Sequence, residues 1–119
     1  MNFRKFWIAS GAVAVGMAAV VLPASPALAA QKSCTIFGSS CTTGTLPANS
    51  SSHSITVCVR GFGGVAQGWD KTTNRKVGPS VTVVSSTTDL KCVDVGGLYG
   101  SSYYTLAAGS VGHQGYISN

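Results

Sequence analysis

The sequence predicts a small all-β domain, an antiparallel β-sandwich or barrel of five to seven short strands with two disulfides. Three observations predict this class. Apolar residues recur at every second position, as in strands, and not at every third or fourth, as in helices. Turn-forming residues interrupt these runs about every ten residues. Four cysteines also occur in this short chain.

Residues 1–29 have the pattern of a secretory signal peptide. Two early basic residues precede an uncharged apolar run, and the ALA sequence at 27–29 supplies the small residues that signal peptidase accepts. We expect cleavage after Ala29, with Ala30 as the alternative, so that residues 30–119 form a single secreted domain. The apolar run is shorter than the ~20 residues that span a bilayer, so no membrane association is expected after cleavage. Its Ala-, Val- and Gly-rich composition is typical of a bacterial source.

The four cysteines are Cys34, Cys41, Cys58 and Cys92. An even number in a small exported domain predicts two disulfides. Three pairings are open, and we prefer Cys34 with Cys41 and Cys58 with Cys92. In the chain-entropy model, the loop of about 8 residues contributes ~2.5 kcal/mol and the loop of about 35 residues ~4 kcal/mol. Neither a Cys-x-x-Cys motif nor paired histidines occur, so no metal site is expected.

The clearest strand is SITVCVRG at 54–61, followed by DLKCVDV at 89–95. In both segments, apolar residues alternate with a cysteine and polar residues, so each cysteine lies on the more polar face. If the strands are antiparallel neighbours with opposed cysteines, the disulfide crosses the outer face of a sheet whose valines form the core. A bridge between two sheets is the alternative.

This pairing fixes the neighbours of other residues in the two strands. Arg60 would lie across from Leu90, and Thr56 would lie across from Asp94.

Residues 65–86, between these strands, are expected to form a hairpin. Asp70 and Asn74 flank the expected turn, because both residues tolerate turn conformations and bond back to their own backbone. Pro79 indicates an edge strand or a strand start, since it has no main-chain donor for a ladder. Residues 42–53 are expected to be a polar connection.

Two final strands are predicted at YYTLAAG, 103–109, and GYISN, 115–119, around a loop that contains Gly112 and His113. Adjacent residues of a strand point to opposite faces, so one of Tyr103 and Tyr104 is expected inside and one outside. The expected arrangement places Tyr104 inward with Leu106 and Ala108, and Tyr103 outward.

Candidate catalytic residues are lacking, and we expect no enzyme activity and no cofactor. The chain contains three aspartates and no glutamate, and the aspartates are explained as one turn residue, one strand-entry residue and one outward strand residue. No Gly-x-Ser-x-Gly motif supports a serine nucleophile. The glycines at 61–64 lack the helix and lysine of a phosphate-binding loop.

The charge of the secreted domain also limits its function. Six basic residues and three aspartates give residues 30–119 a net charge of +3. The only basic cluster is Lys71, Arg75 and Lys76 at the expected hairpin tip, which is too small for a nucleic-acid interface.

The aromatic residues are the best candidates for function. We expect binding through Trp69, Tyr99 and Tyr103 together with the basic hairpin tip, because exposed Tyr and Trp provide rigid contact area with a polar group. Alternatively, Trp69 could fill the core with Phe37 and Phe62. The sequence therefore predicts a secreted, non-enzymatic recognition domain that binds an extracellular protein as an inhibitor or antagonist. The first alternative is a carbohydrate- or cell-wall-binding module, and the second is a structural cell-surface protein.

The chain resembles in plan the small secreted bacterial inhibitors such as the proteinaceous α-amylase inhibitors. The resemblance lies in the exported all-β domain with two disulfides and in VGGLYGSSYYTL at 95–106. It implies inhibition of an enzyme by surface contact. The cysteine spacings differ, and the Trp-Arg-Tyr loop that those inhibitors present to the enzyme is absent from this chain.

Overall fold

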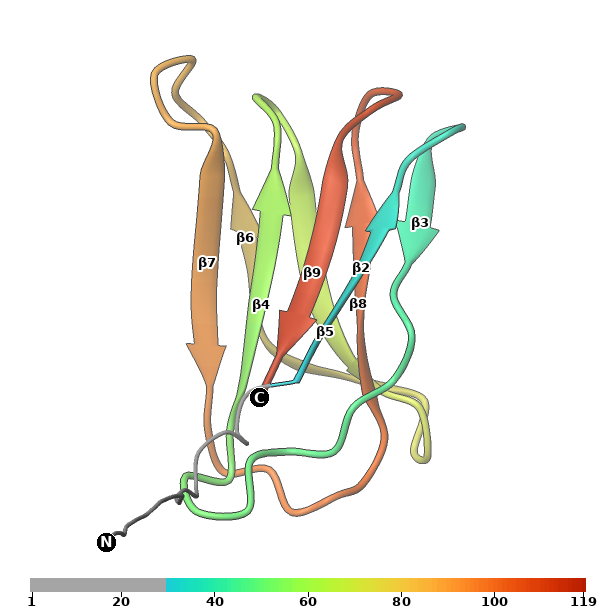
Figure 1. Cartoon of the computed structure of the whole chain (residues 1–119), viewed down its shortest axis with the longest axis vertical. Coiled ribbons are helices and arrows are strands. Elements are labelled where there is room, and N and C mark those ends of the chain that lie inside the picture. The colour runs from blue at the N-terminus through green and yellow to red at the C-terminus, as the bar shows by residue number, and fades with distance from the viewer. Residues whose placement is uncertain (1–29) are drawn as a thin grey trace, which may run out of the picture.

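The computed structural model describes residues 30–119, which form two antiparallel β-sheets packed face to face (Figure 1). The eight strands are β2 (Gln31–Thr35), β3 (Ser40–Thr42), β4 (Ile55–Arg60), β5 (Val65–Asp70), β6 (Arg75–Thr82), β7 (Leu90–Val95), β8 (Tyr103–Ala108) and β9 (Gln114–Ser118). The first sheet has the order β2-β9-β4-β7 and the second β3-β8-β5-β6. These residues contain no helix, and thus none long and apolar enough to cross a membrane.

The predicted all-β sandwich class is confirmed, and only the number of strands differs from the prediction. The strand count exceeds five to seven because β2 and β3 form from Ser-, Thr- and Lys-containing segments without an alternating apolar pattern. Both are edge strands with mostly exposed side chains. The predicted signal peptide lies outside the described residues.

The core lies between the sheets and consists mainly of β-branched side chains. Strand β4 contributes three side chains that are at most 1% exposed, in the alternating pattern predicted from its sequence. Full burial of a side chain of this size contributes roughly 1.5–3 kcal/mol. The buried cluster is Leu46, Ile55, Val57, Val59, Ala66, Val81, Val83, Val95, Leu98, Tyr103 and Ile117.

The two predicted disulfides are present, and they perform different structural roles. Cys58 and Cys92 are directly opposed on β4 and β7, so this bridge crosses the outer face of the first sheet. Cys34 and Cys41 belong to β2 and β3, edge strands of different sheets, so their bridge joins the two sheets at one side. The preferred pairing is thereby confirmed.

The predicted register of β4 and β7 is also confirmed. Arg60 lies opposite Leu90, and Thr56 lies opposite Asp94. The Thr56 hydroxyl donates a hydrogen bond of 2.6 Å to Asp94. Alternation and one cysteine pair thus sufficed to align the strands, because a one-residue slip would turn the valines outward.

The predicted hairpin is formed by β5 and β6. Its turn lies where expected: Asp70 accepts hydrogen bonds from the main-chain N–H groups of Thr72 and Thr73, at 2.9 and 3.3 Å. Asn74 has a positive φ of 57°, which Asn adopts more readily than most residues. Pro79 lies in β6, the edge strand of the second sheet, in agreement with the expectation.

A bulge interrupts this hairpin on the β6 side. The pairing shifts between Ala66 and Gly68, so extra residues of β6 face Gln67. The Gln67 amide donates to the carbonyl oxygens of Val77 and Gly78, at 3.0 and 2.9 Å. It therefore satisfies main-chain acceptors that lack ladder partners at the bulge.

Strands β8 and β9 are the predicted final strands, but they belong to different sheets. Their connection, residues 109–113, therefore crosses from one layer to the other. Ala30 and Asn119 lie beside each other at the opposite end of the sandwich (Figure 1), where the Ala30 N–H donates to the Asn119 side chain at 2.9 Å. In return, the Asn119 N–H donates to the Ala30 carbonyl at 3.1 Å.

The orientation expected for the adjacent tyrosines is wrong, although one is inside and one outside. Tyr103 is 2% exposed and points into the core with Thr105 and Ala107, whereas Tyr104 is half-buried on the outer face. Leu46 forms a β-bridge with Tyr103 and packs in the same core. The large ring of Tyr103 therefore fills part of the core beside Leu46 of the connection at 43–54.

Candidate functional site

The basic residues predicted for binding lie together at the tip of the β5–β6 hairpin. Lys71, Arg75 and Lys76 are all exposed. The only salt bridge among residues 30–119 joins Arg60 to Asp89, so these three cations have no acidic partner there. The hairpin tip is therefore free to attract an anionic group.

The predicted aromatic residues divide between three environments. Trp69 is half-buried on the outer face of the second sheet, and Tyr99 is 80% exposed in the loop between β7 and β8. Tyr99 stacks on His53, with ring centroids 4.4 Å apart. Tyr103, which is buried, cannot contribute to a contact surface and is removed from the predicted binding set. Phe37 and Phe62 do not fill the core, because they are 84% and 60% exposed.

Trp69 instead forms a pair with Tyr104 across β5 and β8. The two residues are register partners, and their rings lie 6.5 Å apart with an angle of 9° between their planes. Lys76 of β6 is the register partner of Trp69 on its other side. The indole Nε1 of Trp69 is buried and has no hydrogen-bond partner within residues 30–119.

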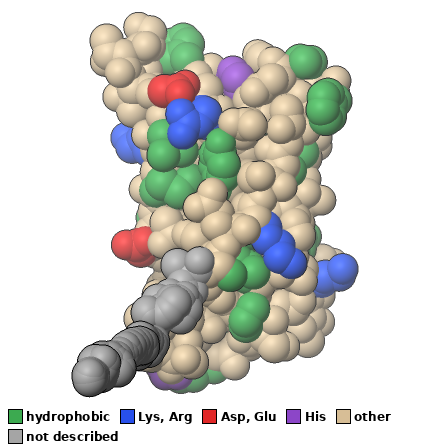
Figure 2. All heavy atoms as spheres, in the orientation of Figure 1, with side chains coloured by type: hydrophobic (Ala, Val, Ile, Leu, Met, Phe, Trp, Pro, Cys, Tyr) green, Lys and Arg blue, Asp and Glu red, His purple; other side chains and the backbone are tan. Residues whose placement is uncertain are grey.

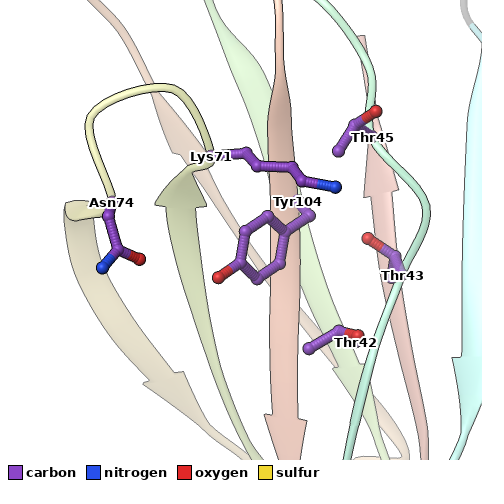
Figure 3. Close-up of a pocket in the computed structure, with 6 residues that line it drawn as sticks. All are labelled: Thr42, Thr43, Thr45, Lys71, Asn74 and Tyr104. Atoms are coloured by element: carbon purple, nitrogen blue, oxygen red, sulfur yellow. The ribbon is translucent and has the colours of Figure 1, made fainter.

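Beside this pair lies a surface hollow of about 440 Å³, here named the Tyr104 hollow. Figure 3 shows the Lys71 side chain running across it from the hairpin toward Thr45, above the Tyr104 ring. Asn74 stands on the hairpin side and the threonines on the opposite side. Its lining residues are Thr42, Thr43, Thr45, Lys71, Asn74 and Tyr104.

A second hollow, about 350 Å³, lies on the outer face of the first sheet around Arg60 and Tyr116. The Arg60 guanidinium lies 5.8 Å from the Tyr116 ring centroid, donates to the Tyr116 hydroxyl at 3.3 Å and pairs with Asp89. The hydrogen bond to Tyr116, followed by the one to Asp89, raises the pKa of Arg60. Arg60 and Tyr116 are thus engaged with each other, and Arg60 also with Asp89, which favours a structural role for these two residues.

The end of the sandwich opposite the hairpin tip carries exposed apolar side chains that were not predicted as binding residues. Seven large hydrophobic residues are exposed in the described part of the chain, and all except Tyr99 lie in or beside the loops at this end. We name the four at the loops themselves the apolar loop end: Phe37, Phe62, Val84 and Val111. Figure 2 shows hydrophobic side chains projecting at several points along the upper end of the molecule.

Main-chain hydrogen bonds connect these loops in pairs. Ile36 exchanges hydrogen bonds of 2.8 Å with the β8–β9 loop, through the His113 carbonyl and the Gly112 N–H. Gly63 donates to Val83 at 2.8 Å and thereby connects the β4–β5 loop to the β6–β7 loop. The apolar side chains are therefore presented by loops with a defined backbone arrangement.

His113 connects the two loop pairs. Its ring packs against glycines of the β4–β5 and β8–β9 loops, so closely that a β-carbon at Gly109 would lie 2.6 Å from Nδ1. Gly61 contacts the same ring and has a φ of 116°, which side chains rarely permit. A glycine-flanked histidine thus has a packing role that its sequence context did not reveal.

The apolar loop end was missed because Phe37 and Phe62 resemble core residues in the sequence. The only available signal was the position of each phenylalanine next to glycine, in IFG and GFGG. Glycine-flanked residues lie in turns, and turns lie at the surface. An aromatic residue in such a turn is a candidate for contact rather than core.

Comparison with known proteins gives no relative: the chain matches no family model and no curated protein. Among residues 30–119, no three His, Cys, Asp or Glu side chains gather in a group that could hold a metal ion. Two disulfides in a small domain are consistent with an extracellular location.

Proposed function

We propose that this protein is a secreted, non-enzymatic recognition domain that binds an extracellular protein through the apolar loop end. The observation that carries the proposal is the concentration of exposed large hydrophobic residues at this one end. Exposed apolar groups gathered on one face of a small domain mark interaction sites, whereas scattered ones need no explanation.

The composition of the loops favours a protein partner. The four loops contain no lysine and no arginine, and their one acid, Asp89, is paired with Arg60. Serines and threonines, such as Ser39, Thr87 and Ser110, surround the apolar tips. Protein interfaces combine an apolar centre with few charges and a polar rim. A membrane surface would instead favour basic residues around the apolar tips.

The connected loops support inhibition or antagonism rather than a flexible attachment. Two phenylalanines on hydrogen-bonded loops can enter recesses of a partner without first losing conformational freedom, which lowers the entropic cost of binding. This proposal keeps the inhibitor-like function expected from the sequence. It moves the contact from Trp69, Tyr99, Tyr103 and the basic hairpin tip to the apolar loop end.

The experiment is a binding and inhibition screen in solution with the purified, oxidised protein. A panel of secreted hydrolases is tested for co-elution in size-exclusion chromatography and for loss of activity. We then compare Phe37→Ser and Phe62→Ser with Tyr99→Ser, a control at the opposite end that also removes an exposed aromatic side chain. We expect each Phe variant to weaken a captured complex by about tenfold or more and the Tyr99 variant to leave it unchanged.

Three outcomes would reject this assignment. A complex that is unchanged in both Phe variants would place the contact elsewhere. Self-association that depends on Phe37 and Phe62, measured by analytical ultracentrifugation, would favour a structural cell-surface role. Retention of the protein on insoluble cell wall, chitin or cellulose, with no hydrolase bound, would favour the carbohydrate-binding alternative.

A further inference from the structure

We infer that the Tyr104 hollow is a second binding site, which takes one sugar unit of an acidic polysaccharide bearing carboxylate or sulfate groups. Tyr104 is the second residue of β8 and lies at the end of the sandwich away from the loop at 109–113. The site is therefore separate from the apolar loop end, and either surface can fail experimentally without the other.

The shape and the aromatic groups of the hollow favour a sugar ring. Its volume of about 440 Å³ lies within the range of small-ligand sites, roughly 300–1,000 Å³. The Tyr104 ring lines it, and Trp69 lies nearly parallel on the neighbouring strand. A flat aromatic surface accepts the apolar C–H face of a sugar while the sugar hydroxyls remain free for hydrogen bonds.

Polar groups suited to sugar hydroxyls surround this aromatic surface. Thr42, Thr45 and Asn74 line the hollow, and their side chains form no hydrogen bond within residues 30–119. Hydroxyl and amide groups can both donate and accept, as sugar recognition requires. Thr43 differs, because its hydroxyl already bonds to Gly44 and to the N–H of Thr105.

The charge of the site points to an acidic sugar. Lys71 crosses the hollow, and none of the lining residues is a carboxylate (Figure 3). The nearest acid in sequence, Asp70, is engaged with the N–H groups of the hairpin turn. An unpaired ammonium beside neutral hydroxyls attracts an anion, and further cations at Arg75 and Lys76 lie along the same hairpin.

Trp69 provides a direct measurement of binding, because it is the only tryptophan in residues 30–119. Its fluorescence is followed during titration with oligogalacturonate, with heparin oligosaccharides and with neutral malto-oligosaccharides. We expect a saturable change with at least one acidic oligosaccharide, weakening as NaCl is added, and none with the neutral series. A response to oligogalacturonate would show that carboxylate groups suffice, whereas a response to heparin oligosaccharides alone would show that sulfate groups are required.

Matched variants test whether binding occurs in the hollow. Lys71→Gln and Tyr104→Ala are each expected to weaken binding by about tenfold. Lys91→Gln, which removes the same charge from the other sheet, should bind as the parent protein does. Melting temperatures of all three variants establish that they are folded.

The inference is overturned if neither acidic oligosaccharide binds, or if neutral sugars bind equally well. It is also overturned if folded Lys71→Gln and Tyr104→Ala variants bind normally. If Lys91→Gln weakened binding as much as Lys71→Gln does, the oligosaccharide would be held by general attraction between charges, and a defined site would be rejected.

Discussion

The main-chain N–H of Gly100 donates a hydrogen bond of 2.7 Å to the hydroxyl of Tyr103, a residue that is only 2% exposed. This bond provides the buried phenol with a partner and fixes the β7–β8 loop against the end of the core. The same contact explains the glycine, because a β-carbon at position 100 would lie 2.6 Å from the tyrosine oxygen.

Tyr103 and Tyr104 should therefore differ sharply in their effect on stability. Tyr103→Ala removes a buried ring and should lower the free energy of unfolding by about 3–5 kcal/mol. Tyr103→Phe, which loses only the hydroxyl, should cost about 1 kcal/mol. Tyr104→Ala, on the outer face, should cost about 1 kcal/mol or less. Urea denaturation measures all three, and an equal cost of the two alanine variants would contradict the inward orientation of Tyr103.

The packing of His113 against Gly61 predicts a non-additive pair of substitutions. Gly61→Ala introduces a side chain at a φ of 116° and into the His113 ring, so we expect a loss of about 1–3 kcal/mol. His113→Ala should relieve part of that loss, since it removes the steric conflict. Gly38→Ala is the control, because nothing lies within 4 Å of a β-carbon there. Additive effects of Gly61→Ala and His113→Ala would argue against the contact.

The two disulfides should contribute unequally to stability. Replacing Cys58 and Cys92 with alanine opens the longer loop and should cost ~4 kcal/mol, compared with ~2.5 kcal/mol for the Cys34–Cys41 pair. Denaturant unfolding of the two double variants compares these losses. A greater loss for Cys34–Cys41 would indicate that joining the two sheets matters more than loop length.

Gln67 is predicted to stabilise the bulge in β5–β6 through its amide. Gln67→Met keeps the length of the side chain but leaves the carbonyls of Val77 and Gly78 without this donor, so a loss of about 1 kcal/mol is expected. Hydrogen exchange should show faster exchange in β6 and unchanged exchange in β4. If β6 were equally protected from exchange in Gln67→Met and in the parent protein, Gly78 and Pro79 would be sufficient to maintain the bulge without the amide.

Much of the first sheet followed from the sequence, because β4 and β7 combine strict alternation with one cysteine each. These two features together predicted both the register of β4 against β7 and the face on which each side chain lies. The pairing of Thr56 with Asp94 is one example. The strands β2 and β3 were not recognised, since they are stabilised by pairing with β9 and β8 and by a disulfide rather than by burying an apolar face. Local pattern carries little information about such edge strands.

The candidate sites were less predictable than the fold. Alternation shows that Tyr103 and Tyr104 face opposite ways, but it does not show which of them is inside. That choice depends on Leu46, distant in sequence, which pairs with Tyr103 at the end of the core. The position of the hairpin turn was predicted correctly. The Tyr104 hollow was not predicted, because threonines from the distant 42–45 segment form one of its sides.

The proximity of Ala30 and Asn119 has a practical consequence for presenting this domain on a solid support. Both residues lie at the end of the sandwich opposite the apolar loops, where they are joined by hydrogen bonds. A tether attached after Asn119 would orient Phe37 and Phe62 away from the support and would leave the Tyr104 hollow nearer to it. Attachment through a cysteine introduced in the β6–β7 loop would reverse this arrangement, so comparing the two immobilised forms would reveal which end of the molecule captures a partner.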